Sequence, residues 1–81
     1  ISVNPNPFID KTSIEFYMPE SMEGTWEYYD VNGRKIYTTN GFYQKGVQTI
    51  DVTRNELNSK GIIYVRFIST TFSSEYKMIV L

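Results

Sequence analysis

The fold of this chain is constrained most by a series of short runs in which apolar and polar residues alternate. In the clearest run, Lys11–Met18, apolar side chains recur at every second position from Ile14 onwards, and Pro19 ends the run. Successive side chains of a β-strand point to opposite faces of its sheet. The alternation therefore predicts a strand with one buried face.

Similar runs follow along the whole chain, with turn residues between them. A turn is expected at Glu20–Gly24, and Asn32-Gly33 predicts a tight hairpin with a type I′ turn, because both residues tolerate a positive φ. Further strands are expected over Thr25–Asp30, Arg34–Thr39, Gln48–Val52, Gly61–Phe67 and Glu75–Leu81, with a loop or short edge strand over Phe42–Gln44.

A helix is expected only at residues 53–57, where Thr53 and Glu56 have the spacing of a capping box. This single turn would place Leu57 over one end of a core formed by the inward-facing strand residues. About seven strands separated by turns are typical of an antiparallel β-sandwich of two sheets. The expected inward-facing residues are Ile14, Phe16, Met18, Trp26, Tyr28, Ile36, Ile50, Val52, Ile63, Val65 and Phe67.

The last five residues combine one charge with four apolar side chains. Lys77 is followed by Met78, Ile79, Val80 and Leu81, and alternation places Met78 and Val80 on one face of the strand and the other two on the opposite face. Either the domain's own core or a partner must cover these residues. The second apolar face favours a partner.

The composition of the chain excludes several classes of function. The 81 residues include no cysteine and no histidine, so disulfides, thiolate ligands and imidazole chemistry are excluded. Eight basic and nine acidic residues are interspersed, which does not favour a nucleic-acid-binding face. No apolar run approaches the roughly 20 residues that span a bilayer. The sequence contains no catalytic nucleophile with a general base to activate it, and no phosphate-binding loop. We therefore expect a non-enzymatic domain without a cofactor.

The sequence also contains candidates for two other kinds of site. Asp30, Asn32 and Asp51 lie near strand ends and could bind calcium, but their spacing resembles no oxygen-ligand loop, and turn chemistry explains the first two better. Outward-facing tyrosines could form a carbohydrate platform of an accessory module or adhesin, although cross-strand packing is the favoured explanation. These tyrosines are Tyr17, Tyr29, Tyr37, Tyr43 and Tyr64.

Three segments of the chain resemble the motifs of a known family in their order and distances. The first is Pro5–Phe8, which we call the N-terminal arm; its prolines lack N–H groups, so it is extended and delivers Phe8 to a fixed place. The second is the hairpin Tyr29–Arg34, and the third joins Gly61–Phe67 to Lys77–Leu81. Together they resemble the C-terminal sorting domain of the type IX (Por) secretion system over essentially the whole chain.

This resemblance implies an immunoglobulin-like β-sandwich, a single domain over residues 1–81 that was excised from a larger secreted precursor. It implies a non-enzymatic signal that directs a covalently linked upstream passenger through the outer membrane. The implied partners are the outer-membrane type IX translocon with its shuttle proteins, and a surface sortase-like protease that usually removes the domain. The implied location is the periplasm in transit, then the cell surface or the extracellular space.

The resemblance also assigns roles to matching positions. Recognition by the translocon is expected at Gly61, Lys77, Met78, Ile79, Val80 and Leu81. Structural motif positions are Pro5, Asn6, Pro7, Phe8, Asp30, Asn32, Gly33, Arg34, Val65 and Arg66. We expect the translocon to read the terminal strand by strand addition, in which main-chain hydrogen bonds give affinity and alternate side chains give selectivity.

Overall fold

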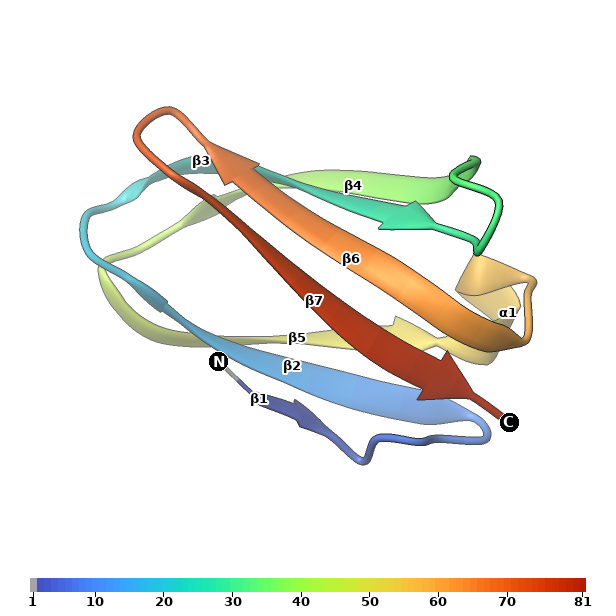
Figure 1. Cartoon of the computed structure of the whole chain (residues 1–81). Coiled ribbons are helices and arrows are strands. Elements are labelled where there is room, and N and C mark those ends of the chain that lie inside the picture. The colour runs from blue at the N-terminus through green and yellow to red at the C-terminus, as the bar shows by residue number, and fades with distance from the viewer. Residues whose placement is uncertain (1) are drawn as a thin grey trace.

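The computed structural model describes residues 2–81, which form seven strands and one short helix arranged as a sandwich of two sheets (Figure 1). The elements are β1 (Ser2–Asn4), β2 (Lys11–Met18), β3 (Met22–Tyr29), β4 (Lys35–Tyr43), β5 (Gly46–Thr53), α1 (Arg54–Leu57), β6 (Gly61–Ser69) and β7 (Ser73–Val80). This confirms the predicted all-β fold, and the arrangement is compatible with an immunoglobulin-like sandwich.

Two antiparallel sheets form the layers of the sandwich. The smaller sheet has the order β1-β2-β5 and the larger has the order β4-β3-β6-β7. The two C-terminal strands form a hairpin, because β6 and β7 pair in continuous register from Gly61 opposite Val80 to Ile68 opposite Ser73. The last strand of the chain is therefore an edge strand of the larger sheet.

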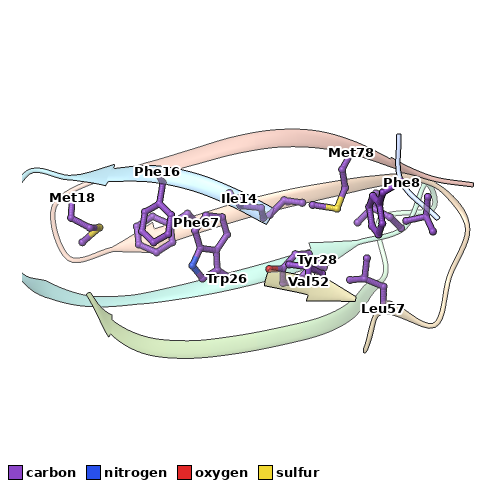
Figure 2. Packing of buried hydrophobic residues seen from close by; sticks show 13 residues of the cluster. Phe8, Ile14, Phe16, Met18, Trp26, Tyr28, Val52, Leu57, Phe67 and Met78 are labelled. Carbon is purple, nitrogen blue, oxygen red and sulfur yellow. The ribbon is translucent and has the colours of Figure 1, made fainter. Parts of the chain in front are cut away.

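The hydrophobic core lies between the two sheets. The Phe16 ring packs edge to face on Trp26 at a centroid distance of 5.0 Å, and Trp26 lies 4.7 Å from Phe67. Figure 2 shows Phe8, Leu57 and Met78 at the same end of the core, so the predicted position of Leu57 is confirmed. The buried apolar residues are Phe8, Ile14, Phe16, Met18, Trp26, Tyr28, Val52, Leu57, Ile63, Val65, Phe67, Met78 and Val80.

The strands β3 and β4 extend through glycines at which their alternation predicts an end. β3 begins before Gly24, which the sequence pattern assigned to a turn, and Gly24 pairs with Gly41 of β4. The Phe67 ring occupies the space in front of Gly24 where a side chain would otherwise lie. β4 likewise continues to Tyr43, where a separate loop or edge strand was expected. Glycines carry no apolar or polar signal, so the alternation could not be followed through them.

A bulge changes which residues of β4 face the core. Tyr37 pairs with Tyr28 and Lys35 pairs with Tyr29, so Ile36 has no partner of its own in β3. Ile36 and Tyr37 consequently both pack against the core, although alternation predicts only Ile36 there. An extra residue in one strand of a pair bends that strand and re-aims its side chains.

The helix α1 is the predicted single turn. Thr53 Oγ1 accepts a hydrogen bond from the Glu56 N–H at 3.2 Å, and Glu56 Oε1 accepts one from the Thr53 N–H at 2.9 Å, which confirms the capping box. Asn58 ends the helix in the left-handed region with φ 48°, and Gly61 opens β6 with φ 86°. Positive φ favours glycine because it has no Cβ, which accounts for the residue type at Gly61.

Candidate functional site

The candidate site begins with the alternation along β7. Met78 and Val80 point into the core and are 0% and 2% exposed, respectively. On the opposite side, Ile79 is half-buried and Leu81 is 57% exposed. The predicted division of these four residues between two faces is therefore confirmed. One face completes the core, and the other presents apolar side chains on the outside of the larger sheet.

Residues of β6 continue this outer apolar surface. Ile62 lies directly opposite Ile79 in the register, and Tyr64 lies opposite Lys77. Side chains directly opposite each other on one face of an antiparallel pair are in contact range. We call Ile62, Tyr64, Lys77, Ile79 and Leu81 the terminal face. It lies on the outward side of the hairpin formed by β6 and β7, the two strands labelled in Figure 1.

A shallow hollow of about 220 Å³ adjoins the terminal face. Two cross-strand rows line it, with Tyr29 opposite Tyr64 in one and Arg66 opposite Glu75 in the next. Arg66 Nε lies 3.9 Å from Glu75 Oε1, so these two charges partly compensate each other. Lys77 makes no ion pair within residues 2–81. It is the uncompensated charge of the terminal face.

The N-terminal arm closes the outer edge of β7 beside this face. Asn6 Nδ2 donates to the Lys77 carbonyl at 3.3 Å, and Asn6 Oδ1 accepts from the Ile79 N–H at 2.8 Å. The Phe8 N–H donates to the Ile79 carbonyl at 3.0 Å, and the Phe8 carbonyl accepts from the Leu81 N–H at 2.8 Å. Four backbone groups on this stretch of the edge are thus bonded within the chain.

This closure contradicts the prediction that a partner adds a strand to Lys77–Leu81. Strand addition needs free N–H and C=O groups along an edge. In this fold, four such groups of the segment already bond the N-terminal arm. The sequence pattern could not reveal the closure, because the side-chain contacts join residues 71 and 73 positions apart. The side chains of the outer face remain accessible.

Separate contacts hold the N-terminal arm in place. The Phe8 ring is buried at the end of the core (Figure 2), which confirms its predicted fixed position. The buried Thr12 donates its hydroxyl to the Pro5 carbonyl at 2.6 Å. β1 pairs with β2 in the smaller sheet, while Phe8 forms a parallel bridge with Val80 in the larger one. The arm therefore joins the two sheets beside the terminal face.

The hairpin motif between β3 and β4 is a structural turn. The Asp30 carbonyl accepts from the Gly33 N–H at 3.0 Å, and its carboxylate accepts from the N–H groups of Asn32 at 2.9 Å and Arg34 at 3.0 Å. Gly33 has φ 81°, whereas Asn32 does not have a positive φ. The predicted type I′ turn is therefore wrong. Of the five residues between β3 and β4, only Gly33 is left-handed, and the Asp30 carboxylate stabilises the turn.

We expect acid to destabilise this region. The Arg34 N–H lowers the pKa of Asp30 below its usual value, and the hydrogen bond from Lys35 lowers the pKa of Glu27. A carboxylate with a lowered folded-state pKa stabilises the fold above its unfolded pKa, and this contribution is lost as the pH falls through the folded pKa. The melting temperature of chain 1–81 should be nearly constant near neutral pH and fall below about pH 4, as measured by circular dichroism.

The matched variant for this prediction is Asp30→Asn. It removes the titrating group but keeps an oxygen acceptor for the turn. Its melting temperature should be lower at neutral pH and should fall less steeply in acid. An acid dependence as steep as that of the unchanged chain would show that Asp30 contributes nothing to it.

Several other motif residues serve the fold. Val65 is a core residue that is 1% exposed, and Arg66 lies on the outer surface beside Glu75. A Cβ at Gly61 would meet no atom within 4 Å, so its residue type follows from backbone conformation rather than contact. Of the recognition candidates, the outer side of the larger sheet therefore holds Lys77, Ile79 and Leu81, whereas Gly61, Met78 and Val80 have structural positions.

The five tyrosines that are candidates for a carbohydrate platform do not share a face. Tyr17 is 59% exposed on the outside of the smaller sheet, whereas Tyr64 is 47% exposed on the outside of the larger one. Tyr29 lies beside Tyr64 but is half-buried. Tyr37 and Tyr43 pack against the core. The prediction that all five face outward is therefore wrong, and they form no common platform.

The carboxylates that are candidate calcium ligands form hydrogen bonds within the chain. The Ser13 hydroxyl donates to Asp51 Oδ1 at 2.6 Å, and the Asp30 carboxylate bonds its own turn. Within residues 2–81, no group of three or more acidic side chains gathers where it could hold a metal ion. No helix in this range is long and apolar enough to cross a membrane.

Comparison with known proteins identifies one matching family model, described as the secretion system C-terminal sorting domain. It matches residues 2–81, a range that includes the N-terminal arm, the Asp30 turn and the terminal face. No curated protein and no solved structure matches the chain.

Proposed function

Because this chain belongs to the family of secretion system C-terminal sorting domains, we propose that it is the folded export signal of a larger protein and is read through its terminal face. A sorting signal of type IX secretion interacts with the secretion machinery and directs export toward the cell surface or the extracellular space. The surface that the machinery would recognise is the terminal face.

The two-sided character of β7 carries this proposal. Its inner face is already part of the core, yet its outer face presents Ile79 and Leu81 next to the uncompensated Lys77. Adjoining apolar side chains on an outer surface mark interaction sites. A complementary partner would offer an apolar pocket and an acidic group opposite Lys77. Gly61, Met78 and Val80 would contribute by holding this face in place.

The closed edge favours recognition through side chains. With the N-terminal arm bonded along residues 77–81, a partner can bind the outer face without displacing any strand. One translocon that exports unrelated passengers needs a recognition element that all of them share. A folded surface that requires no ligand can serve as this element. Recognition would involve the translocon and its shuttle proteins, first in the periplasm and then at the outer membrane.

We further propose that residues 1–81 are the C-terminal domain of a larger precursor. The passenger would be attached upstream of β1, and a surface sortase-like protease would remove the domain by cutting upstream of it. The arm runs parallel to β7, so the start of β1 lies back from the end of β7 (Figure 1). A passenger attached there would leave the terminal face accessible.

A reporter fusion tests this function. Joined to the C-terminal end of an inert exported reporter, residues 1–81 should place the reporter on the surface of a bacterium that has type IX secretion. Removing Lys77–Leu81 should leave the reporter in the periplasm, because the terminal face loses most of its members. Protease accessibility of the reporter in intact cells, combined with cell fractionation, measures the distribution.

The control is the same pair of fusions in a strain without the translocon, where neither should reach the surface. Surface display of the trimmed fusion would contradict the proposal. Display of the trimmed fusion together with measurable glycan binding by residues 1–81 would instead support the accessory binding module.

A further inference from the structure

We propose that Asn6 is a positioning residue for the terminal face, whose side chain replaces a neighbouring strand along part of β7. The inference rests on the proposed function of that face. It concerns a residue in the N-terminal arm that does not itself belong to the recognised surface.

The geometry of Asn6 reproduces strand pairing. A side-chain amide has one carbonyl oxygen and N–H donors, the same groups that a peptide unit presents to its neighbour. Asn6 uses both, donating to the Lys77 carbonyl at 3.3 Å and accepting from the Ile79 N–H at 2.8 Å. Pro5 and Pro7 lack N–H groups. The side chain therefore supplies the pairing that the prolines on either side cannot.

Asn6 and Phe8 together cover consecutive edge positions of β7. Asn6 bonds the backbone on the N-terminal side of Ile79, and Phe8 bonds the Ile79 carbonyl and the Leu81 N–H. Ile79 is thus held between β6 and the arm, while the Ile79 and Leu81 side chains face outward. Holding a surface in its bound arrangement lowers the ordering cost that a partner's binding must offset.

The test compares Asn6→Ala with Asn4→Ala in the same chain. Asn4 also precedes a proline and is exposed, but its side chain makes no hydrogen bond within residues 2–81. In Asn6→Ala, the amide of Ile79 should exchange with solvent at least about fivefold faster, as expected for the loss of one hydrogen bond. The amide of Val65 in the central strand β6 should not change. Asn4→Ala should leave both rates unchanged.

Export of the reporter fusion provides the functional measurement. Asn6→Ala should reduce the surface-displayed fraction severalfold, and Asn4→Ala should not. Thr53→Ala serves as a control for general stability, because it removes the helix cap without touching β7. It should lower the melting temperature and keep export.

The inference would be overturned by an unchanged exchange rate at Ile79, or by accelerated exchange with unchanged export. Equal loss of export in Asn6→Ala and in Thr53→Ala would also overturn it, since the effect would then follow stability alone. Export of the fusion that lacks Lys77–Leu81 would refute the function of the terminal face itself. If that trimmed fusion is retained while Asn6→Ala is exported, only the role of Asn6 fails.

Discussion

Replacing Ile79 and Leu81 together by serine should abolish surface display of the reporter while the domain stays folded. Both side chains lie on the outer side of the larger sheet, and Leu81 is 57% exposed, so little core packing is lost. Substitutions outside the core usually change stability by less than about 0.5 kcal/mol. A partner that buries both side chains would lose about 1.5–3 kcal/mol for each of them. Protease accessibility in intact cells measures the loss of display.

The inner face of the same strand provides the contrast. Met78→Ala truncates a side chain that is 0% exposed and should cost about 2–5 kcal/mol of unfolding free energy. Export by this variant should fall together with its melting temperature. The double serine variant should instead lose export at a nearly unchanged melting temperature. Normal display of the double serine variant would rule out recognition through these two side chains.

Gly24→Ala should destabilise the fold, because the Phe67 ring already occupies the space in front of Gly24. A Cβ at Gly24 would overlap Phe67 Cζ at a separation that real Cβ atoms essentially never show. Phe67 cannot move aside easily, because its ring packs on Trp26 at 4.7 Å and on Phe16 at 5.5 Å. Overpacking of this kind costs about 1–3 kcal/mol. For a domain of this size, the melting temperature should fall by about 4–24 °C, measured by thermal unfolding.

Two further variants check the cause of this effect. Gly41→Ala adds a methyl group at the position paired with Gly24, but its nearest neighbour is the hydroxyl at the tip of the half-buried Tyr43. Its effect should be clearly smaller. Combining Gly24→Ala with Phe67→Leu should cost less than the sum of the two single changes, because the ring that clashes is gone. Full additivity would show that Phe67 is not the source of the strain.

Most strand faces could be predicted because alternation is a local property. Ile14, Phe16 and Met18 occupy one buried face, as their spacing of two requires. The capping box of Thr53 and Glu56 also formed as predicted, since both partners lie within one helical turn.

The errors in the expected strands share a physical origin. The alternation predicts a turn that ends at Gly24, but in the fold Gly24 pairs with Gly41 of the neighbouring strand and lies against the buried Phe67 ring. The bulge at Ile36 turns Tyr37 toward the core, against the alternation. These outcomes depend on what packs opposite each residue. A one-dimensional pattern does not contain that information.

In the candidate site, too, some features follow from the local sequence and others only from the tertiary structure. The sequence by itself determined that the end of the chain would form a strand with apolar residues on both faces, because side-chain direction alternates along any strand. The strand ends at Val80, one residue earlier than predicted. Only the tertiary structure decided that this strand lies at a sheet edge and that Asn6 and Phe8 close the edge. Residues at opposite ends of the chain meet there because β1 and β7 are edge strands of different sheets. The N-terminal arm leads from β1 to the edge of β7. Because the arm bonds the backbone groups along residues 77–81, only the outer side chains of this stretch are accessible to a partner.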